Sequence, residues 1–142
     1  GVEAPPAQVE HLITAQAAEV GTLQRGALFV RGDDAHDGKI LDQDPDNIAA
    51  LEWLGKKYFW KAEDIYVKEM TDYKNNRTTS QYKRLLNKLD EVYPTFEKAR
   101  DYFLQLYKLK PRPEYAEFLG NIYKRLQEEQ KAEYYYNKAK QR

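Results

Sequence analysis

The chain has 142 residues, of which 42% are hydrophobic and 32% are charged, and its formal net charge is zero. This length and balance are typical of one globular domain and exclude a wholly disordered chain. The sequence contains no cysteine, one serine and two histidines. It therefore lacks disulfides and thiolate chemistry, and it offers too few groups for a hydrolase triad or a histidine-rich metal site. We expect a non-catalytic binding module without a cofactor or a metal.

Charge and hydropathy set looser limits. No apolar run approaches the roughly 18 residues of a membrane-spanning helix, so we expect no transmembrane segment. The absence of cysteine fits the cytoplasm and a periplasmic or exported location equally. Residues 1–73 hold 7 Lys/Arg and 14 Asp/Glu, whereas residues 74–142 hold 16 and 9. This asymmetry fits an anionic partner on one half, or simply solvated helix faces that differ.

The first 46 residues are rich in Ala, Gly and Asp and contain no tyrosine. We expect residues 1–6 to be disordered and a helix to begin near Ala7, after two prolines. Its apolar positions are spaced like one helix face: Val9, Leu12, Ile13, Val20 and Leu23. After Gly32, a short helix should follow and end near Leu41.

From Ile48 onward, apolar residues recur every three or four positions, which predicts helices almost throughout. The first stripe runs to Tyr73, and the polar segment 74–80 is turn-prone. The second stripe runs over residues 82–107 and keeps its phase across Pro94, which favours a kink over a restart.

The prolines at 111 and 113 end the second stripe. A third helix is expected over residues 115–126 and a fourth over residues 132–139. Residues 47–142 lack Gly/Asn hairpin dipeptides between alternating apolar runs, so a sheet is not expected and the predicted fold class is all-α.

Two segments share a pattern of aromatic, Leu-Gly and a tyrosine three residues after the glycine. They are Leu51–Tyr58 around Gly55 and Ala116–Tyr123 around Gly120. A small and a large residue follow each of them, Ala99 and Phe103 after the first, and Ala132 and Tyr136 after the second. This pattern resembles the tetratricopeptide repeat (TPR) superfamily, whose units are antiparallel helix pairs stacked into a solenoid. The resemblance implies one domain over residues 7–142, with units at 7–46, 47–111 and 112–142.

The middle unit is longer than the last one. Ala99 follows Gly55 by 44 residues, whereas Ala132 follows Gly120 by 12. The extra residues continue the apolar stripes, so we expect a projecting helical hairpin, as in some bacterial TPR-like proteins, with each helix about 20 Å longer. In its seam we expect eight residues to pack together, so that Leu86→Asp would unfold the hairpin: Ile65, Tyr66, Met70, Tyr73, Tyr82, Leu85, Leu86 and Leu89.

TPR arrays bind a peptide or a partner protein in a groove lined by the first helix of each unit. The resemblance places eight residues at or beside that groove: Glu52, Lys56, Phe59, Trp60, Glu117, Asn121, Lys124 and Arg125. An exposed aromatic near charged groups is a plausible anchor for a partner. The alternative is that Phe59 and Trp60 are core residues. Because Glu52 stands where the family's clamp for C-terminal carboxylates needs a lysine, we do not infer that ligand.

The last helix contains three successive tyrosines, of which Tyr136 should face inward and Tyr134 should be the most exposed. We therefore expect Tyr134 to contact a partner. The competing interpretation is a self-associating module that forms a homodimer through the hairpin or this helix.

Two other functions are weaker fits. Residues 33–44 partly match a calcium-binding loop, but Ala35 replaces a ligand and Asp44 stands where glutamate is normal. Basic residues interleaved with tyrosines after Tyr82 could suggest RNA binding, but most of these tyrosines lie on apolar stripes. We do not expect nucleic acid to be the partner.

Overall fold

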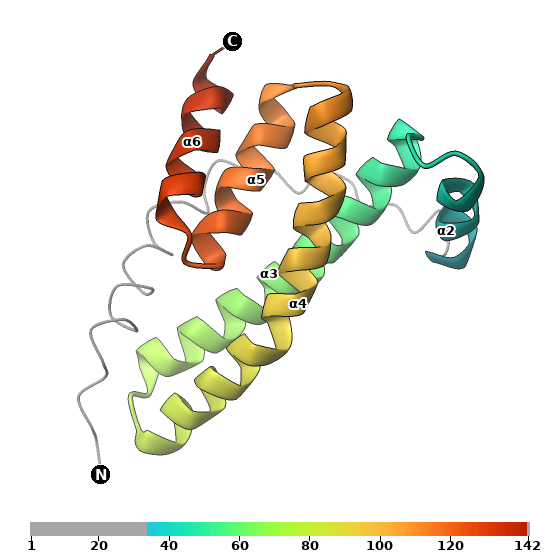
Figure 1. Cartoon of the computed structure of the whole chain (residues 1–142). Helices are drawn as coiled ribbons and strands as arrows, with labels where there is room; N and C mark the ends of the chain where they lie inside the picture. Colours follow the sequence, from blue (N-terminus) through green and yellow to red (C-terminus); the bar gives the residue numbers. More distant parts are fainter. Residues whose placement is uncertain (1–33, 142) are drawn as a thin grey trace.

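A computed structural model describes residues 34–141, shown in Figure 1. The expected disordered segment 1–6 and the helix expected from Ala7 lie outside the described residues. Over residues 34–141 the chain consists of helices joined by short turns, with no strand, which confirms the all-α class. The helices are α2 (Asp34–Gln43), α3 (Ile48–Asn75), α4 (Thr79–Leu109), α5 (Pro113–Arg125) and α6 (Glu129–Lys140).

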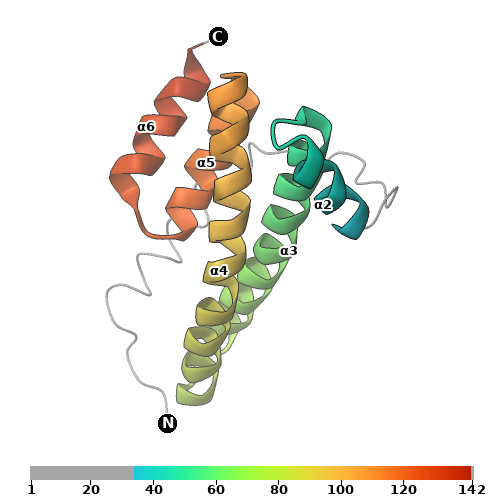
Figure 2. The same ribbon diagram turned by 45° about the vertical axis from the view of Figure 1, so that its right-hand side comes forward.

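The helix expected to end near Leu41 is present as α2, which packs against α3 (Figure 2). The segment compared with a calcium loop is therefore helical over Asp34–Gln43, and a regular helix does not wrap around an ion. Within residues 34–141, no group of three or more acidic or histidine side chains is placed to hold a metal. Likewise, no helix in this part of the chain combines the length and the apolar character needed to cross a membrane.

The helices α3 and α4 are long because each begins with a side-chain cap and neither is broken. The Asn47 side chain accepts a hydrogen bond from the Ala50 backbone N–H at 2.9 Å, and the Thr78 hydroxyl accepts one from the Gln81 N–H at 3.2 Å. Such caps satisfy N–H groups that the first turn leaves unpaired. Helix α4 continues through Pro94, as the phase of its apolar stripe indicates.

The seam between α3 and α4 differs from the expected one at two positions. Leu85, Tyr66 and Met70 are fully buried, but Leu86 is 39% exposed and Ile65 is 37% exposed. Successive residues of a helix point about 100° apart, so one leucine of an adjacent pair must leave the seam. The expectation that Leu86→Asp would unfold the hairpin is therefore wrong, and Leu85 is the seam residue.

Helices α5 and α6 form a second antiparallel pair that lies beside α4. In both pairs a glycine of the first helix faces an aromatic ring of the second. A Cβ added at Gly55 would lie 3.1 Å from the Phe103 ring, and one added at Gly120 would lie 2.5 Å from the Tyr136 ring. Each glycine thus lets the second helix approach closely, because a larger residue would push the ring away.

The core between the two pairs is aromatic. Phe118 of α5 stacks on Phe103 of α4, with ring centroids 4.4 Å apart, and meets Phe59 of α3 edge-on at 5.2 Å. These rings bury large apolar areas and prefer the stacked and edge-on geometries observed here. The three helices are therefore held together at one shared cluster.

The pair of α3 and α4 extends well beyond the turn that joins α5 to α6 (Figure 1). Where this extension begins, Glu63 pairs with Arg125, whose guanidinium also lies over the Tyr66 ring, and Gln127 donates a hydrogen bond to the Tyr93 hydroxyl. We call residues 64–92, between Glu63 and Tyr93, the arm. With 28 residues in α3 and 31 in α4, against 13 in α5 and 12 in α6, the expected projecting hairpin is confirmed.

Candidate functional site

The residues expected at the groove fall into three classes of exposure. Four of them are buried: Phe59, Trp60, Asn121 and Arg125. Another four are half-buried: Glu52, Lys56, Glu117 and Lys124. Only Tyr134, on α6, is exposed, at 53%. Most of the expected contact residues thus face other parts of the chain.

Phe59 and Trp60 belong to the core, which is the alternative that the sequence left open for them. Phe59 has no exposed surface, and its ring meets the Trp60 ring edge-on at 4.9 Å. Trp60 in turn lies edge-on to Phe118, at 6.5 Å. Neither ring can anchor a partner in this arrangement, because Phe59 lies against α4 and α5 and Trp60 against α5, with at most 8% of either residue exposed.

Arg125 is a structural residue, held in a buried ion pair. Its guanidinium donates two hydrogen bonds to the Glu63 carboxylate, at 2.7 and 2.8 Å, and both side chains are at most 4% exposed. The guanidinium also lies over the Tyr66 ring, 4.4 Å from its centroid. Burial raises the pKa of Tyr66 to about 12, although the nearby Arg125 opposes this rise. This cluster joins α5 to α3 where the arm begins.

Glu52 and Lys56 also connect α3 to α5. The Tyr115 hydroxyl donates a short hydrogen bond to Glu52, and the Lys56 ammonium lies 3.1 Å from the Glu114 carboxylate. Burial, and then the Glu52 carboxylate, raise the pKa of Tyr115 above its ordinary value. These two predicted groove residues are therefore engaged within the chain.

Asn121 and Lys124 lie on α5 beside a hollow that the sequence did not suggest, and Lys124 lines it. The Asn121 side chain donates to the Glu117 carbonyl at 2.9 Å and accepts a hydrogen bond from the Tyr136 hydroxyl at 3.2 Å. Lys124 lies 3.8 Å from Glu129, and both line the hollow. Its volume is about 480 Å³, and its lining residues are Lys124, Glu129, Gln130, Ala132, Glu133, Tyr136, Asn137 and Lys140.

The hollow lies along one face of α6. Glu129, Glu133, Tyr136 and Lys140 follow one another at three or four residues, so a single stripe of the helix lines it. This stripe carries both signs of charge as well as the amides of Gln130 and Asn137. A polar stripe at helical spacing is visible in the sequence, but it is also typical of an ordinary solvated face.

The three successive tyrosines of α6 point in different directions. Tyr134 is the most exposed, as expected, and the Lys138 ammonium lies 5.5 Å from the centroid of its ring. Tyr135 stacks on Tyr123, with centroids 5.6 Å apart, and meets Tyr107 of α4 edge-on. Tyr136 covers Gly120. Tyr134 is therefore the most exposed ring of the three.

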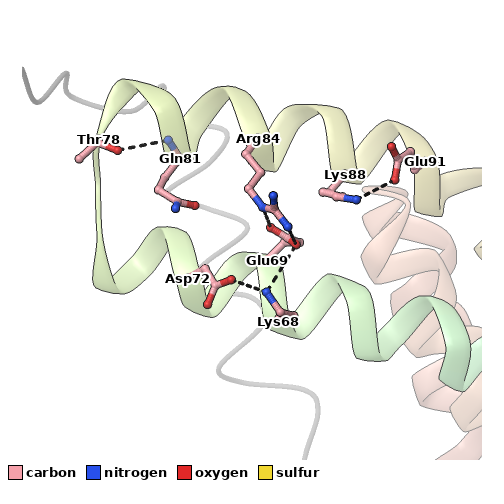
Figure 3. A network of polar contacts seen from close by, with 8 residues as sticks. All are labelled: Lys68, Glu69, Asp72, Thr78, Gln81, Arg84, Lys88 and Glu91. Atoms are coloured by element: carbon pink, nitrogen blue, oxygen red, sulfur yellow. Dashed lines mark hydrogen bonds and ion pairs between the residues drawn. The ribbon is translucent and has the colours of Figure 1, made fainter.

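Ionic contacts, rather than a ligand-like cluster, dominate the polar surface of the arm (Figure 3). The Arg84 guanidinium donates two hydrogen bonds to Glu69, at 3.0 and 3.1 Å, which ties α4 to α3. Lys68 bonds Asp72 one turn away at 2.7 Å. The pair of Arg84 and Glu69 therefore links the two helices of the arm, whereas the pair of Lys68 and Asp72 lies within α3.

Comparisons of the chain with models of protein families, with curated proteins and with solved structures find no match. Assignment of a function therefore depends on the geometry described above.

Proposed function

We propose that the chain is a non-catalytic, TPR-like scaffold that binds a peptide segment of a partner protein along α5 and α6. The repeat-like architecture is supported by the recurring contact between glycine and an aromatic ring. Gly55 with Phe103 and Gly120 with Tyr136 occupy corresponding places in two helix pairs of different length. In a repeat protein, each pair packs on its neighbour and together they create an extended binding surface.

The observation that carries the binding proposal is the hollow along α6. Its lining offers lysines, glutamates and side-chain amides, which together suit an extended peptide with polar backbone groups and mixed charge. Lys124 is the predicted groove residue that lines it. The proposed site is therefore displaced from the expected groove toward the face formed by α5 and α6.

Selection of peptides from a random display library on the full-length chain tests this proposal. Kd is then measured for each selected peptide with the unmodified chain, with Lys140→Glu and with Lys83→Glu. Lys140 lines the hollow, whereas Lys83 is an exposed lysine on the arm. We expect Lys140→Glu to weaken binding by about tenfold, which corresponds to about 1.4 kcal/mol, and Lys83→Glu to leave it unchanged. The proposal fails if no peptide is retained, or if both variants act alike.

Self-association is the second candidate function, and the exposed Tyr134 ring favours it. Aromatic side chains are enriched at interfaces because they bury a large area at little entropic cost. Light scattering during size-exclusion chromatography should then show a dimer that Tyr134→Lys dissociates. A monomer at every concentration would eliminate this candidate.

A further inference from the structure

One face of the arm has no partner among the helices of residues 34–141. Glu63 faces α5 through Arg125, and Tyr93 faces the turn between α5 and α6 through Gln127. Side chains one or two turns farther along each helix point to the same side. The side of α3 and α4 that α5 covers near its end therefore continues along the arm, where no other described helix lies (Figures 1 and 2).

This continuing face carries apolar side chains beside the exposed charges of Lys74 and Asp90. Val67 follows Glu63 by one turn and is half-buried, and Leu86 precedes Tyr93 by two turns and is 39% exposed. Tyr82, one turn farther toward the tip, is also half-buried. We call the surface formed by Val67, Tyr82 and Leu86 the arm face. Because it is continuous with the interface that α5 already covers, it is suited to receive another amphipathic helix.

The same chain contains a segment of the required kind. Residues 7–23 lie outside the described residues, and their sequence places apolar side chains on one helical stripe: Val9, Leu12, Ile13, Val20 and Leu23. A helix of this length would measure about 25 Å. Each helix of the arm is expected to be about 20 Å longer than its counterpart in a regular unit. A helix of residues 7–23 would therefore be about as long as the extension that it is proposed to cover.

Ten residues connect this segment to α2. Residues 24–33 can span about 33 Å when extended, and two of them, Gly26 and Gly32, make the connection permissive. Val67 lies about 29 Å along α3 from the first residue of that helix, and α2 packs on α3. Because the tether makes docking intramolecular, its extent should not depend on the concentration of the chain.

From these observations we propose that residues 7–23 form an amphipathic helix that docks, within the same molecule, on the arm face. This inference stands apart from the proposed peptide site, which lies on α5 and α6. It differs from the expectation that residues 7–46 form a first repeat unit beside α3, because that arrangement would place the segment near α2. The contact would keep the apolar surface of the arm from solvent and from other molecules.

Paramagnetic relaxation enhancement on the full-length chain distinguishes these arrangements, since the absence of cysteine allows one spin label at a time. Thr71→Cys places the label beside the arm face, and Asp42→Cys places it on α2; both positions are exposed. We expect the amide signals of residues 9–23 to lose most of their intensity with the label at 71 and little with the label at 42. Loss with the label at 42 alone, or with neither label, overturns the proposal.

Two further measurements complete the test. In a mixture of isotope-labelled chains with spin-labelled, unenriched chains, signal loss in residues 9–23 would identify a second copy as the occupant and overturn intramolecular docking. The double variant Leu12→Asp/Ile13→Asp should abolish the effect of the label at 71. Thr14→Asp/Thr22→Asp adds the same charge on the opposite side of the predicted helix and should retain the effect. Equal behaviour of the two double variants would contradict the proposal.

Discussion

Replacing Glu63 by glutamine removes one charge of the buried pair with Arg125 and keeps the shape of the side chain. Arg125 is 1% exposed, and its guanidinium is bonded to Glu63 at 2.7 and 2.8 Å. Without the carboxylate, a full positive charge remains buried beside the Tyr66 ring and a neutral amide, neither of which carries a compensating charge. The variant should therefore lose stability through the uncompensated charge.

The expected loss is about 3–5 kcal/mol, the usual cost of removing one partner of a buried ion pair. Domains of this size are stable by only about 5–15 kcal/mol, so a large part of the stability would disappear. Replacing both partners by apolar residues, in Glu63→Leu/Arg125→Met, should recover most of it, because no buried charge remains. Asp72→Asn is the matched control, since its exposed pair with Lys68 should contribute about 0.5 kcal/mol or less.

Urea unfolding followed by circular dichroism measures these differences, and the four chains should give similar m-values if each unfolds in one step. A loss below about 1 kcal/mol for Glu63→Gln would refute the reasoning. So would a double variant that is no more stable than the single one, because the damage would then come from packing and not from charge.

Three further predictions concern the core. Leu85→Asp should unfold the arm by placing a charge in its seam, whereas Leu86→Asp should change stability by less than about 1 kcal/mol, which thermal melts of the two variants will compare. Gly120→Ala should destabilise the chain by about 1–3 kcal/mol, because its Cβ would meet the Tyr136 ring at 2.5 Å. This loss is expected although alanine favours helices more than glycine does. Adding Tyr136→Leu should restore part of the stability, which the same urea titration measures. Finally, Tyr66 should contribute about 2–3 kcal/mol to the loss of stability between pH 10 and 12, because the unfolded chain releases its proton near pH 10 and the folded chain holds it until about 12. Unfolding titrations of Tyr66→Phe should therefore show a shallower alkaline slope than those of the unmodified chain, and an equal slope would contradict this assignment.

Helix positions could be predicted because they depend on local periodicity. Each signal can be recognised within a short window of the sequence. Examples are the apolar stripe after residue 48, the polar turn at 74–80 and the prolines at 111 and 113. The same is true of the long hairpin, since the spacing from Gly55 to Ala99 exceeds that from Gly120 to Ala132. Such signals do not require knowledge of what each helix packs against.

Side-chain roles were harder to predict, because two neighbouring residues of a helix can both appear to belong to its apolar stripe. Leu85 and Leu86 are adjacent and chemically identical, and only the rotation of α4 against α3 buries one and exposes the other. For Phe59 and Trp60, the sequence likewise could not show whether each ring is buried in the core or exposed to a partner. Their burial follows from the position of Phe118 on a helix about 60 residues away.

The sequence by itself determined the all-helical class, the order of the helices and the existence of a projecting hairpin, since these follow from hydrophobic period, proline placement and the unequal spacing within the two repeated motifs. The tertiary structure decided which polar groups are structural and which are accessible. Glu63 and Arg125 are 62 residues apart, and no local pattern marks them as partners. Likewise, the hollow along α6 and the uncovered arm face arise from how far each helix extends past its neighbour, a property of packing between distant segments.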